Sequence, residues 1–421
     1  MHPNKTVIGL ISREYPPYTH VGGIGTYTAA AAKILADHNH VVHVFCNGPR
    51  AEKETLGGIT VHRIPMGNHP LPQSQWFYPY RYWFRKYLPN YLDALTWAQT
   101  VGQYLEQQAA TLQLEVLEFP ETNGEGSRVS VRGILSQTLR ICRIHTSWIS
   151  HYVTGFLESK LLLRLQKKAC HLSNRVVSPS QFMARYYAPQ ILGWKKDVLV
   201  NPNPLKLWEA PFTWQEKNSK HLLFVGRIEY RKGIDLLLGA LAALGQEGKG
   251  LILRVIGAKH PPQNQADVDC QIVFETALKQ HSREANPTGY LLEYLGQQSH
   301  DSLYQHYDWA GITVIPSRQD NYPYTALEAL SRGCFVLASD TGGLPETLAA
   351  CQGALFPQGD QDVLQQKMRE LSQSEDEIRK AWDSNAHIIA ERFSPEVCYQ
   401  RLVSSYAKTN GNLETKELQP R

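Results

Sequence analysis

Short apolar segments rich in β-branched residues alternate with longer segments of helical periodicity along most of the chain. Several of the short segments are apolar on both faces, which is typical of parallel strands covered by helices on both sides of a sheet. The pattern therefore predicts an α/β protein built on doubly wound parallel sheets. The expected strands cover residues 7–12, 41–46, 115–119, 141–145 and 175–178, then 222–225, 251–256, 291–295, 312–315 and 335–338.

A proline-rich break interrupts this alternation near the middle of the chain. Asn201-Pro202-Asn203-Pro204 leads into a mixed polar stretch that reaches residue 220, a composition typical of a linker. We therefore expect a first Rossmann-like domain over residues 1–204, a second over residues 205–395, and a last segment over residues 396–421. Ligands of doubly wound sheets bind at the carboxyl ends of the strands, so the cleft between the domains is the expected site.

The composition is that of a globular protein with a sizeable core. Hydrophobic residues make up 42% of the 421 residues and charged residues 19%, which excludes a wholly disordered chain. The 43 basic side chains nearly balance the 39 acidic ones, for a formal net charge of +4. With so little excess charge and no recognisable nucleic-acid-binding module, no nucleic-acid partner is expected.

The seven cysteines are widely spaced, odd in number and without a C-x-x-C pair. This usage is typical of reduced thiols in a cytoplasmic protein, and it predicts neither a disulfide framework nor a metal site. No stretch approaches the roughly 18–20 apolar residues that span a bilayer. We therefore expect a cytoplasmic protein that is soluble or at most peripheral to a membrane.

A glycine-rich turn precedes the first expected helix. Gly22-Gly23-Ile24-Gly25 leads into an alanine-rich segment with helical periodicity. Glycines at a helix N-terminus let backbone N–H groups approach an anion, which the helix dipole also attracts. A tight turn that needs positive φ would use the same residues, so the turn by itself leaves both interpretations open.

A basic loop follows the first strand of the second half. Gly226-Arg227 comes directly after that strand, and Arg231-Lys232-Gly233 leads into a helix from Ile234. Arginine binds phosphate oxygens in a fork and lysine supplies a compact charge, the combination that a diphosphate requires. A solvated surface loop is the alternative. The place of the loop at the carboxyl end of a strand favours ligand binding.

Two acids follow the strand at residues 312–315. Asp320 lies in the loop after it, and Glu328 lies in a helix that begins near residue 323 or 324. A carboxylate on such an apolar helix needs a partner, because an unpaired buried charge is costly. Sugar or ribose hydroxyls would serve as that partner. A structural salt bridge or a favourable interaction with the helix dipole is the alternative.

Taken together, the chain resembles the GT-B glycosyltransferases of the large retaining family 4, also called glycosyltransferase group 1, from residue 22 to about residue 393. Gly226-Arg227 with Lys232-Gly233 resembles the family's G-R-x-x-x-x-K-G loop, and Asp320 and Glu328 occupy the two acid positions of its E-x7-E motif. The turn Gly342-Gly343-Leu344-Pro345-Glu346 also matches. The resemblance implies two Rossmann-like domains facing a central cleft, with a C-terminal helix that returns to the first domain.

The resemblance also implies a function. It points to transfer of a hexose, with retention of anomeric configuration, from a UDP- or GDP-linked sugar to a saccharide acceptor in polysaccharide or glycoconjugate assembly. No metal and no cofactor besides this co-substrate is implied. Arg227 and Lys232 would hold the diphosphate, Glu328 the ribose and Asp320 the transferred sugar, while His145 would contact that sugar near the reacting carbon. The catalytic positions are thus His145, Asp320, Arg227 and Lys232, and further donor-binding positions are Gly22, Gly23, Gly257, Gln297, Asn321 and Tyr322.

One position departs from the family pattern. Asp320 stands where the family usually has glutamate, and its side chain is shorter by one methylene, roughly 1.5 Å of reach. A shifted loop could preserve the contact, the site could select a different sugar, or the contact could be lost.

A concentration of aromatic and basic residues lies in the first half. Ten of the chain's 42 aromatic side chains fall between residues 75 and 97, interleaved with basic residues. The family binds acceptors in its first domain, so Trp76, Tyr80, Arg81 and Arg85 are acceptor candidates. Packing against the first domain and docking on a membrane surface are the alternatives. The basic segment 160–168 is more typical of a solvated helix face.

Two other functions remain open at this stage. The acceptor could be a small sugar or sugar phosphate, as for an enzyme that resembles sucrose-phosphate synthase. The protein could also bind a nucleotide sugar without turning it over, in which case Asp320 would mark the lost activity. The presence of Arg227, Lys232 and Glu328 argues against the second alternative.

Overall fold

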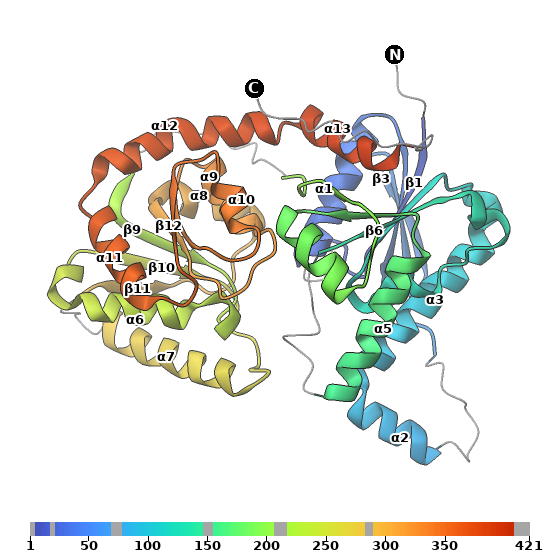
Figure 1. Cartoon of the computed structure of the whole chain (residues 1–421), viewed down its shortest axis with the longest axis horizontal. Coiled ribbons are helices and arrows are strands. Elements are labelled where there is room, and N and C mark those ends of the chain that lie inside the picture. Colours follow the sequence, from blue (N-terminus) through green and yellow to red (C-terminus); the bar gives the residue numbers. More distant parts are fainter. Residues whose placement is uncertain are drawn as a thin grey trace.

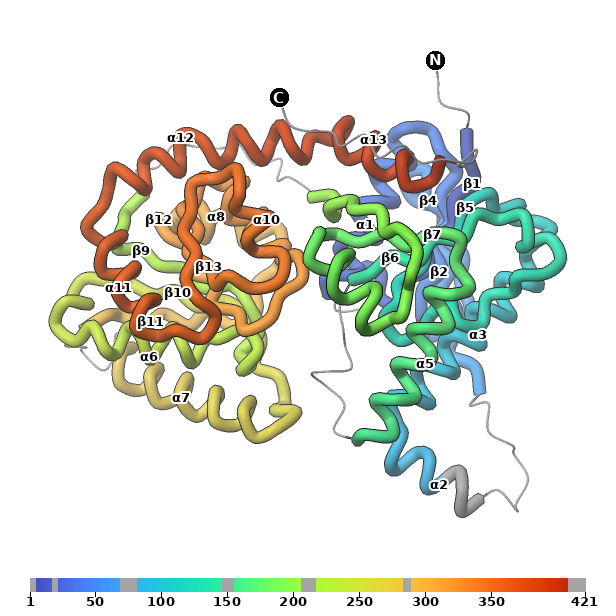
Figure 2. The backbone as a smooth tube through the Cα atoms, viewed as in Figure 1, coloured from blue at the N-terminus to red at the C-terminus, as the bar shows by residue number. Residues whose placement is uncertain are grey.

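The computed structural model describes residues 5–16, 22–68, 78–145, 155–205, 217–282 and 289–407, except for the side chains of residues 78–81. The chain forms two α/β domains that lie side by side (Figure 1). A long helix pair, α12 (Glu375–Arg392) and α13 (Pro395–Tyr406), crosses from the second domain to the first along one side of the molecule, as the tube in Figure 2 also shows.

The first domain is built on a sheet that has eight strands in the described residues, in the order β3-β4-β2-β1-β5-β6-β7-β8. All neighbours are parallel except β3 and β4, which form a hairpin. Its turn residues, Gly57 and Gly58, both have positive φ, as a tight two-residue hairpin turn requires. The strands are β1 (Val7–Ile11), β2 (Val41–Asn47), β3 (Glu52–Leu56), β4 (Ile59–Ile64), β5 (Val116–Pro120), β6 (Leu139–Arg143), β7 (Arg175–Ser178) and β8 (Val198–Val200).

Helices cover both faces of this sheet, and each face has its own buried apolar cluster. The helix α3 buries Trp97, Val101 and Leu105 against one face, whereas α1 buries Ala31 and Leu35 against the other. The helical segments are α1 (Gly23–Asp37), α2 (Tyr78–Tyr87), α3 (Pro89–Leu112), α5 (Phe156–Leu172), the 3₁₀ turns Thr122–Arg128 and Gly133–Gln137, and a π-helix, Met183–Ile191.

Within its described residues, the second domain has a six-stranded parallel sheet in the order β11-β10-β9-β12-β13-β14. Numbered within the domain this is the 3-2-1-4-5-6 order of a doubly wound fold, in which the strand order reverses between β9 and β12. The strands are β9 (Asn218–Val225), β10 (Ile252–Ile256), β11 (Leu291–Tyr294), β12 (Ala310–Ile315), β13 (Phe335–Ser339) and β14 (Gly353–Phe356); the helices are α6 (Ile234–Leu244), α7 (Gln265–His281), α8 (His300–Trp309), α9 (Tyr324–Ser331), α10 (Leu344–Leu348) and α11 (Gln361–Leu371), with 3₁₀ turns at Tyr230–Lys232 and Gly245–Gly248.

The C-terminal helix α13 packs on the first domain. Tyr399, Leu402 and Tyr406 belong to the same buried cluster as the strands β1 and β2. The side chain of Asn201 donates hydrogen bonds to the carbonyl of Arg401 at 2.7 Å and to the Ser405 hydroxyl at 2.8 Å. The chain therefore returns to the first domain, in agreement with the family pattern.

The expected fold class is confirmed, since both sheets are parallel except for β3 and are covered on both faces. The sequence missed β3, β4, β8 and β14. β3 alternates charged residues at an exposed edge, and β8 has only three residues, so neither carries a strong apolar signal. The strands of the first sheet end at Val200 and those of the second begin at Asn218, so the division that we place between residues 204 and 205 falls between them.

All seven cysteines are free thiols. In the described part of the chain, no helix is long and apolar enough to cross a membrane. Nor does that part gather three or more histidine, cysteine or acidic side chains where they would hold a metal ion.

Candidate active site

The loops after β9 and β12 interlock at the carboxyl edge of the second sheet. Gly233 has a φ of +72°, and a Cβ placed there would lie 1.9 Å from the carbonyl oxygen of Pro316. The backbone N–H of Arg318 donates to the carbonyl of Arg231 at 2.8 Å. Glycine is therefore required at position 233, and the contact brings the basic loop onto the loop that carries Asp320.

Lys232 and Asp320 form an ion pair between these two loops. The Lys232 ammonium lies 2.6 Å from Oδ2 of Asp320, and the side chains are only 18% and 12% exposed. Burial alone would raise the pKa of Asp320, but the Lys232 and Arg231 charges outweigh it and hold the pKa below its ordinary value. Burial lowers the pKa of Lys232, and Asp320 opposes that shift. The sequence thus correctly placed both residues at one edge of the sheet.

Arg227 is the most exposed cation of this group, with 38% of its side chain accessible. Its guanidinium lies 3.2 Å from Oε1 of Glu229, which also accepts from Arg231 at 2.7 Å. Arg231 in turn donates to the carbonyl of Gln319 at 3.1 Å. Among these side chains, Arg227, Arg231 and Lys232 carry three positive charges against the two carboxylates of Glu229 and Asp320, which leaves a local positive excess for an anion.

The loops after β10 and β11 complete this edge. Gly257 has a φ of +151°, and a Cβ there would lie 1.8 Å from the carbonyl oxygen of Gly226. The N–H of Gly257 donates to the carbonyl of Gly296 at 2.9 Å, and Gln297 follows as an exposed residue. The structure thus places Gly257 directly against the basic loop and leaves the Gln297 side chain at the surface.

Glu328 has protein partners within its own domain. Its Oε2 accepts from the hydroxyl of the fully buried Tyr307 at 2.9 Å, and its Oε1 lies 3.4 Å from Nε2 of His300. Burial and the Glu328 carboxylate raise the pKa of Tyr307 well above its ordinary value, so this phenol stays a donor. Sequence reasoning missed Tyr307 and His300, because nothing in the strand and helix pattern indicates which residues of α8 face α9.

Asn321 joins the two domains. Its side-chain amide donates to the carbonyl oxygen of His145 at 3.0 Å. The neighbouring Tyr322 packs instead into the apolar cluster beneath α9, where burial raises the pKa of its phenol to about 12. Two of the predicted donor-binding residues therefore point in different directions, and only Asn321 reaches the first domain.

His145 is held tightly at the end of β6. Its backbone N–H donates to Oε2 of the buried Glu121 at 2.8 Å, and its ring lies edge-on to Tyr27 with 5.0 Å between centroids. Burial, aided by the charge of Arg143, lowers the pKa of His145 to about 3, so the imidazole is neutral near pH 7. The cavity beside it measures about 10 Å³, room for roughly one water molecule, so a hexose would need a more open arrangement.

A buried charged cluster lies behind His145. Glu118 and Arg143 form an ion pair with 2.9 Å between Oε1 and Nε, and both side chains are almost fully inaccessible. The Tyr27 hydroxyl donates to Glu118, and Arg143 lies 4.4 Å from the centre of the Tyr27 ring. Arg143 also donates to the carbonyl of Asn201 at 3.1 Å, so the cluster ties β5 and β6 to the segment that leads out of the first domain. Glu118 and Arg143 each stand between apolar residues of an expected strand, and this was the sequence signal that could have indicated the cluster.

The glycine turn before α1 is not the tight turn with positive φ that was one of its two interpretations. Gly22 has a φ of −79° and Gly23 begins the helix, so neither needs the left-handed conformation that a tight turn would require. The N–H of Gly22 donates to Glu14 at 2.8 Å. Among the described residues, a Cβ on Gly23 would meet no atom within 4 Å.

The turn 342–346 lies between the Asp320 loop and the first domain. A Cβ on Gly342 would lie 1.6 Å from the carbonyl oxygen of Asp320. The Glu346 carboxylate accepts from the backbone N–H groups of Gln181 and Phe182, each at 2.7 Å. The contacts of Glu346 and Asn321 with the first domain together form what we call the interdomain latch, and sequence reasoning did not identify Glu346 as part of the site.

Substituting Glu346 by alanine tests this latch. We expect a larger radius of gyration by small-angle X-ray scattering and about tenfold slower donor turnover, because hydrogen bonds to a charged acceptor each contribute about 1.5–3 kcal/mol and partial exposure reduces that. Glu391→Ala, which removes an exposed carboxylate from α12, is the matched control. Equal scattering and equal turnover for Glu346→Ala and Glu391→Ala would contradict a role in holding the domains together.

The acceptor candidates are only partly covered by the structure. Trp76 lies outside the described residues, and so do the side chains of Tyr80 and Arg81, whose backbone belongs to α2. Arg85 is exposed on α2, which lies at the end of the first domain opposite the crossing helices α12 and α13 (Figure 1). No described contact joins Arg85 to His145 or Asp320.

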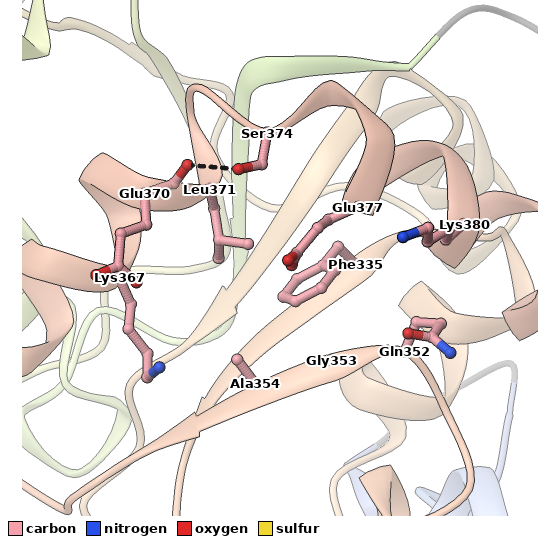
Figure 3. A pocket seen from close by; sticks show the side chains of 10 residues that line it. All are labelled: Phe335, Gln352, Gly353, Ala354, Lys367, Glu370, Leu371, Ser374, Glu377 and Lys380. Carbon is pink, nitrogen blue, oxygen red and sulfur yellow. Dashed lines mark hydrogen bonds between the residues drawn. The ribbon is translucent and has the colours of Figure 1, made fainter.

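A separate pocket of about 290 Å³ lies at the opposite edge of the second sheet (Figure 3). It is floored by Phe335 at the start of β13 and by Gly353 at the start of β14, and Lys367, Glu377 and Lys380 line it. Because ligands of doubly wound sheets bind at the carboxyl ends of the strands, this pocket is not the candidate active site.

Two family models match the chain. Residues 22–204 match the one described as "Glycosyl transferase 4-like domain", and residues 208–388 match "Glycosyl transferases group 1". A glycosyltransferase of Methanocaldococcus jannaschii is 23% identical over 364 residues, which cover 81% of this chain and 82% of the relative. A D-inositol 3-phosphate glycosyltransferase of Mycolicibacterium vanbaalenii is 31% identical over 140 residues, which cover 31% of this chain and 28% of the relative.

The fold is shared with solved structures. Sucrose-phosphate synthase from Thermosynechococcus elongatus matches with a TM-score of 0.69 and 19% identity over 96% of this chain and 98% of that one. At that identity the likeness establishes the common two-domain fold.

Proposed function

The chain belongs to the group 1 glycosyltransferases of GT-B fold, and on this basis we propose that it transfers a hexose from a nucleotide-diphosphate sugar to a saccharide acceptor with retention of anomeric configuration. The observation that carries the proposal is the positive excess of Arg227, Arg231 and Lys232 over Glu229 and Asp320 where the loops of β9 and β12 interlock. This is the carboxyl edge of the sheet, at its topological switch point, where a nucleotide is expected to bind.

In the proposed reaction the acceptor oxygen replaces the diphosphate oxygen on the same face of the anomeric carbon. The bond from the anomeric carbon to the diphosphate oxygen breaks, and a bond from that carbon to the acceptor oxygen forms on the same side. The acceptor proton passes to the departing diphosphate oxygen. Arg227 and Lys232 stabilise the negative charge that develops on that diphosphate, so the proposal includes no metal ion and no further cofactor.

The remaining side chains would orient the two substrates. Asp320, held by Lys232, would accept hydrogen bonds from hydroxyls of the transferred sugar, and Glu328 would accept from the ribose through the oxygen that faces His300. His145 would contact the sugar as a neutral imidazole, since burial lowers its pKa to about 3. This would require the two domains to open around Asn321 and His145 when the donor enters.

A sugar phosphate is the second candidate acceptor. The exposed cations of α2 would suit a phosphate, and the names of the inositol-phosphate relative and of sucrose-phosphate synthase each include a sugar or polyol phosphate. Whether the donor is linked to UDP or to GDP stays a prediction from the sequence, and so does the cytoplasmic location.

A thermal-shift series with nucleosides, nucleoside diphosphates and nucleotide sugars tests the donor. Because a ligand that binds only the folded state raises the melting temperature by mass action, we expect UDP or GDP to stabilise the protein and uridine or guanosine to do so far less. UDP-glucose and GDP-mannose would then identify the base. Equal melting temperatures with every nucleotide would contradict the proposed donor site.

A further inference from the structure

The helix α2 projects beyond the edge of the first sheet where its parallel strands have their carboxyl ends, which we call the catalytic edge. Arg13, which follows β1, forms a two-fold hydrogen-bonded ion pair with Asp93 near the start of α3, with 3.1 Å between Nη2 and Oδ1. This pair places the start of α3 at the carboxyl ends of the strands. Only Leu88 separates α2 from α3, so α2 lies past that edge, as Figures 1 and 2 show.

The start of α5 meets the junction between α2 and α3. The Glu158 carboxylate accepts from the backbone N–H of Tyr91 at 3.0 Å and from the side-chain amide of Asn90 at 3.3 Å. Leu162 and Leu165 of α5 pack in one small apolar cluster with Ala94 and Leu95 of α3. The first turns of α5 and the end of α2 therefore belong to one surface.

This surface exposes large apolar side chains. Phe156 is 77% accessible on α5, and Tyr82 and Tyr87 are 60% and 51% accessible on α2. Trp83 and Leu157 lie beside them and are also exposed. Monomeric proteins rarely leave such side chains together in water unless they contact a partner or a membrane.

The same surface is basic. Arg85 and Lys86 are exposed on α2, and Lys160, Arg164 and Lys168 are exposed on α5. The three α5 cations follow Phe156 at four-residue intervals, so all four side chains share one helix face. In residues 82–92 and 155–168 the only acid is Glu158, which is buried and hydrogen-bonded. The five exposed cations of these segments therefore outnumber their single acid.

We propose that this surface docks the protein on an anionic lipid bilayer. The docking surface comprises Tyr82, Trp83, Arg85, Lys86, Tyr87, Phe156, Leu157, Lys160 and Arg164. Aromatic rings with polar tips settle at the level of lipid headgroups, and lysine and arginine attract the anionic headgroups around them. Because α2 lies past the catalytic edge, docking would turn that edge of the first domain toward the bilayer. The inference goes beyond the proposed reaction and does not depend on it.

Vesicle co-sedimentation of the full chain tests this docking. With vesicles of phosphatidylcholine and phosphatidylglycerol in equal parts at low salt, we expect the protein to sediment, and with phosphatidylcholine alone to stay in solution. Raising the salt to about 0.5 M should release it, because screening weakens attraction between exposed charges. Absence of sedimentation with the anionic vesicles, or equal binding to both kinds, would overturn the proposal.

Charge reversal on the surface provides the matched comparison. Lys86→Glu with Lys160→Glu should lower the bound fraction at least fivefold, and Trp83→Ser with Phe156→Ser should also lower it. Lys220→Glu with Lys249→Glu changes the net charge equally at exposed positions of the second domain and should bind as the unaltered protein does. Circular dichroism melting would verify that each variant is folded. An equal loss of vesicle binding in both charge-reversal pairs would overturn the proposal. Displacement of the protein from the vesicles by duplex DNA, added so that its phosphate charge equals that of the anionic lipid, would also overturn it.

Discussion

Arg227→Ala is expected to slow the release of nucleoside diphosphate from the donor by about 10²–10³-fold, the usual cost of removing one group that stabilises charge developing in a transition state. Arg227 is the most exposed of the three cations in the basic loop, and its guanidinium lies 3.2 Å from Glu229. Its removal should therefore leave folding nearly unchanged, while the diphosphate loses its fork of donors. Steady-state release of UDP or GDP from the donor identified by thermal shift is the measurement.

Arg50→Ala is the matched control for this prediction. Arg50 also precedes a glutamate by two positions, lies 3.8 Å from Glu52 and is 81% exposed, but it lies in the loop between β2 and β3 of the first domain and is not one of the candidate site residues. Its loss should change the rate less than twofold. A rate for Arg227→Ala within threefold of the unaltered protein would mean that the basic loop does not hold the diphosphate.

Breaking the Lys232–Asp320 pair is expected to have the second large effect. Asp320→Ala leaves the Lys232 ammonium buried without its carboxylate, which costs about 3 kcal/mol of stability, the low end for a buried pair that loses one partner. Lys232→Met should cost a similar amount because Asp320 is then left unpaired. The double variant should recover much of that loss, since neither charge remains uncompensated.

The double-mutant cycle separates stability from chemistry. Denaturant unfolding gives the coupling energy, and donor turnover is measured in the same four proteins. We expect turnover to fall at least about 10²-fold in all three variants, because both side chains are proposed to contact the donor. Full turnover in Asp320→Ala would show that this residue does not bind the transferred sugar.

Asp320→Glu addresses the departure from the family pattern. A glutamate keeps the charge that neutralises Lys232, so we expect stability close to that of the unaltered protein and turnover within about tenfold of it, the range of a contact displaced by one methylene. If Glu and Ala variants lose the same turnover, the length of the Asp320 side chain is part of what the loop has adapted to.

Alternating apolar segments sufficed to predict the two parallel sheets and the edge at which the basic loop and Asp320 meet. Both follow from local rules, because strands that run parallel bring their carboxyl ends together. The pairing of Lys232 with Asp320 needed one further fact, the contact of Gly233 with the Pro316 carbonyl, which sets the two loops at van der Waals distance.

Contacts between distant segments were beyond such rules. The Glu346 carboxylate binds backbone N–H groups of Gln181 and Phe182, and this depends on how the two domains are placed, which no periodicity encodes. The burial of Glu118 with Arg143 likewise arises only when β5 and β6 are paired and Tyr27 of α1 covers them. A charged residue inside an apolar segment indicated that such a cluster exists, but it did not indicate which residues would be its partners.

The central claim is that the edge around Arg227, Lys232 and Asp320 cleaves the bond between a sugar and a nucleoside diphosphate. The most direct measurement is the release of nucleoside diphosphate from a saturating nucleotide sugar in the absence of any acceptor. The proposed chemistry predicts slow release with water as the acceptor, and its suppression in Arg227→Ala but not in Arg50→Ala. Stabilisation by the nucleotide sugar without any release, with or without added saccharides, would contradict catalysis and indicate a protein that only binds its nucleotide sugar.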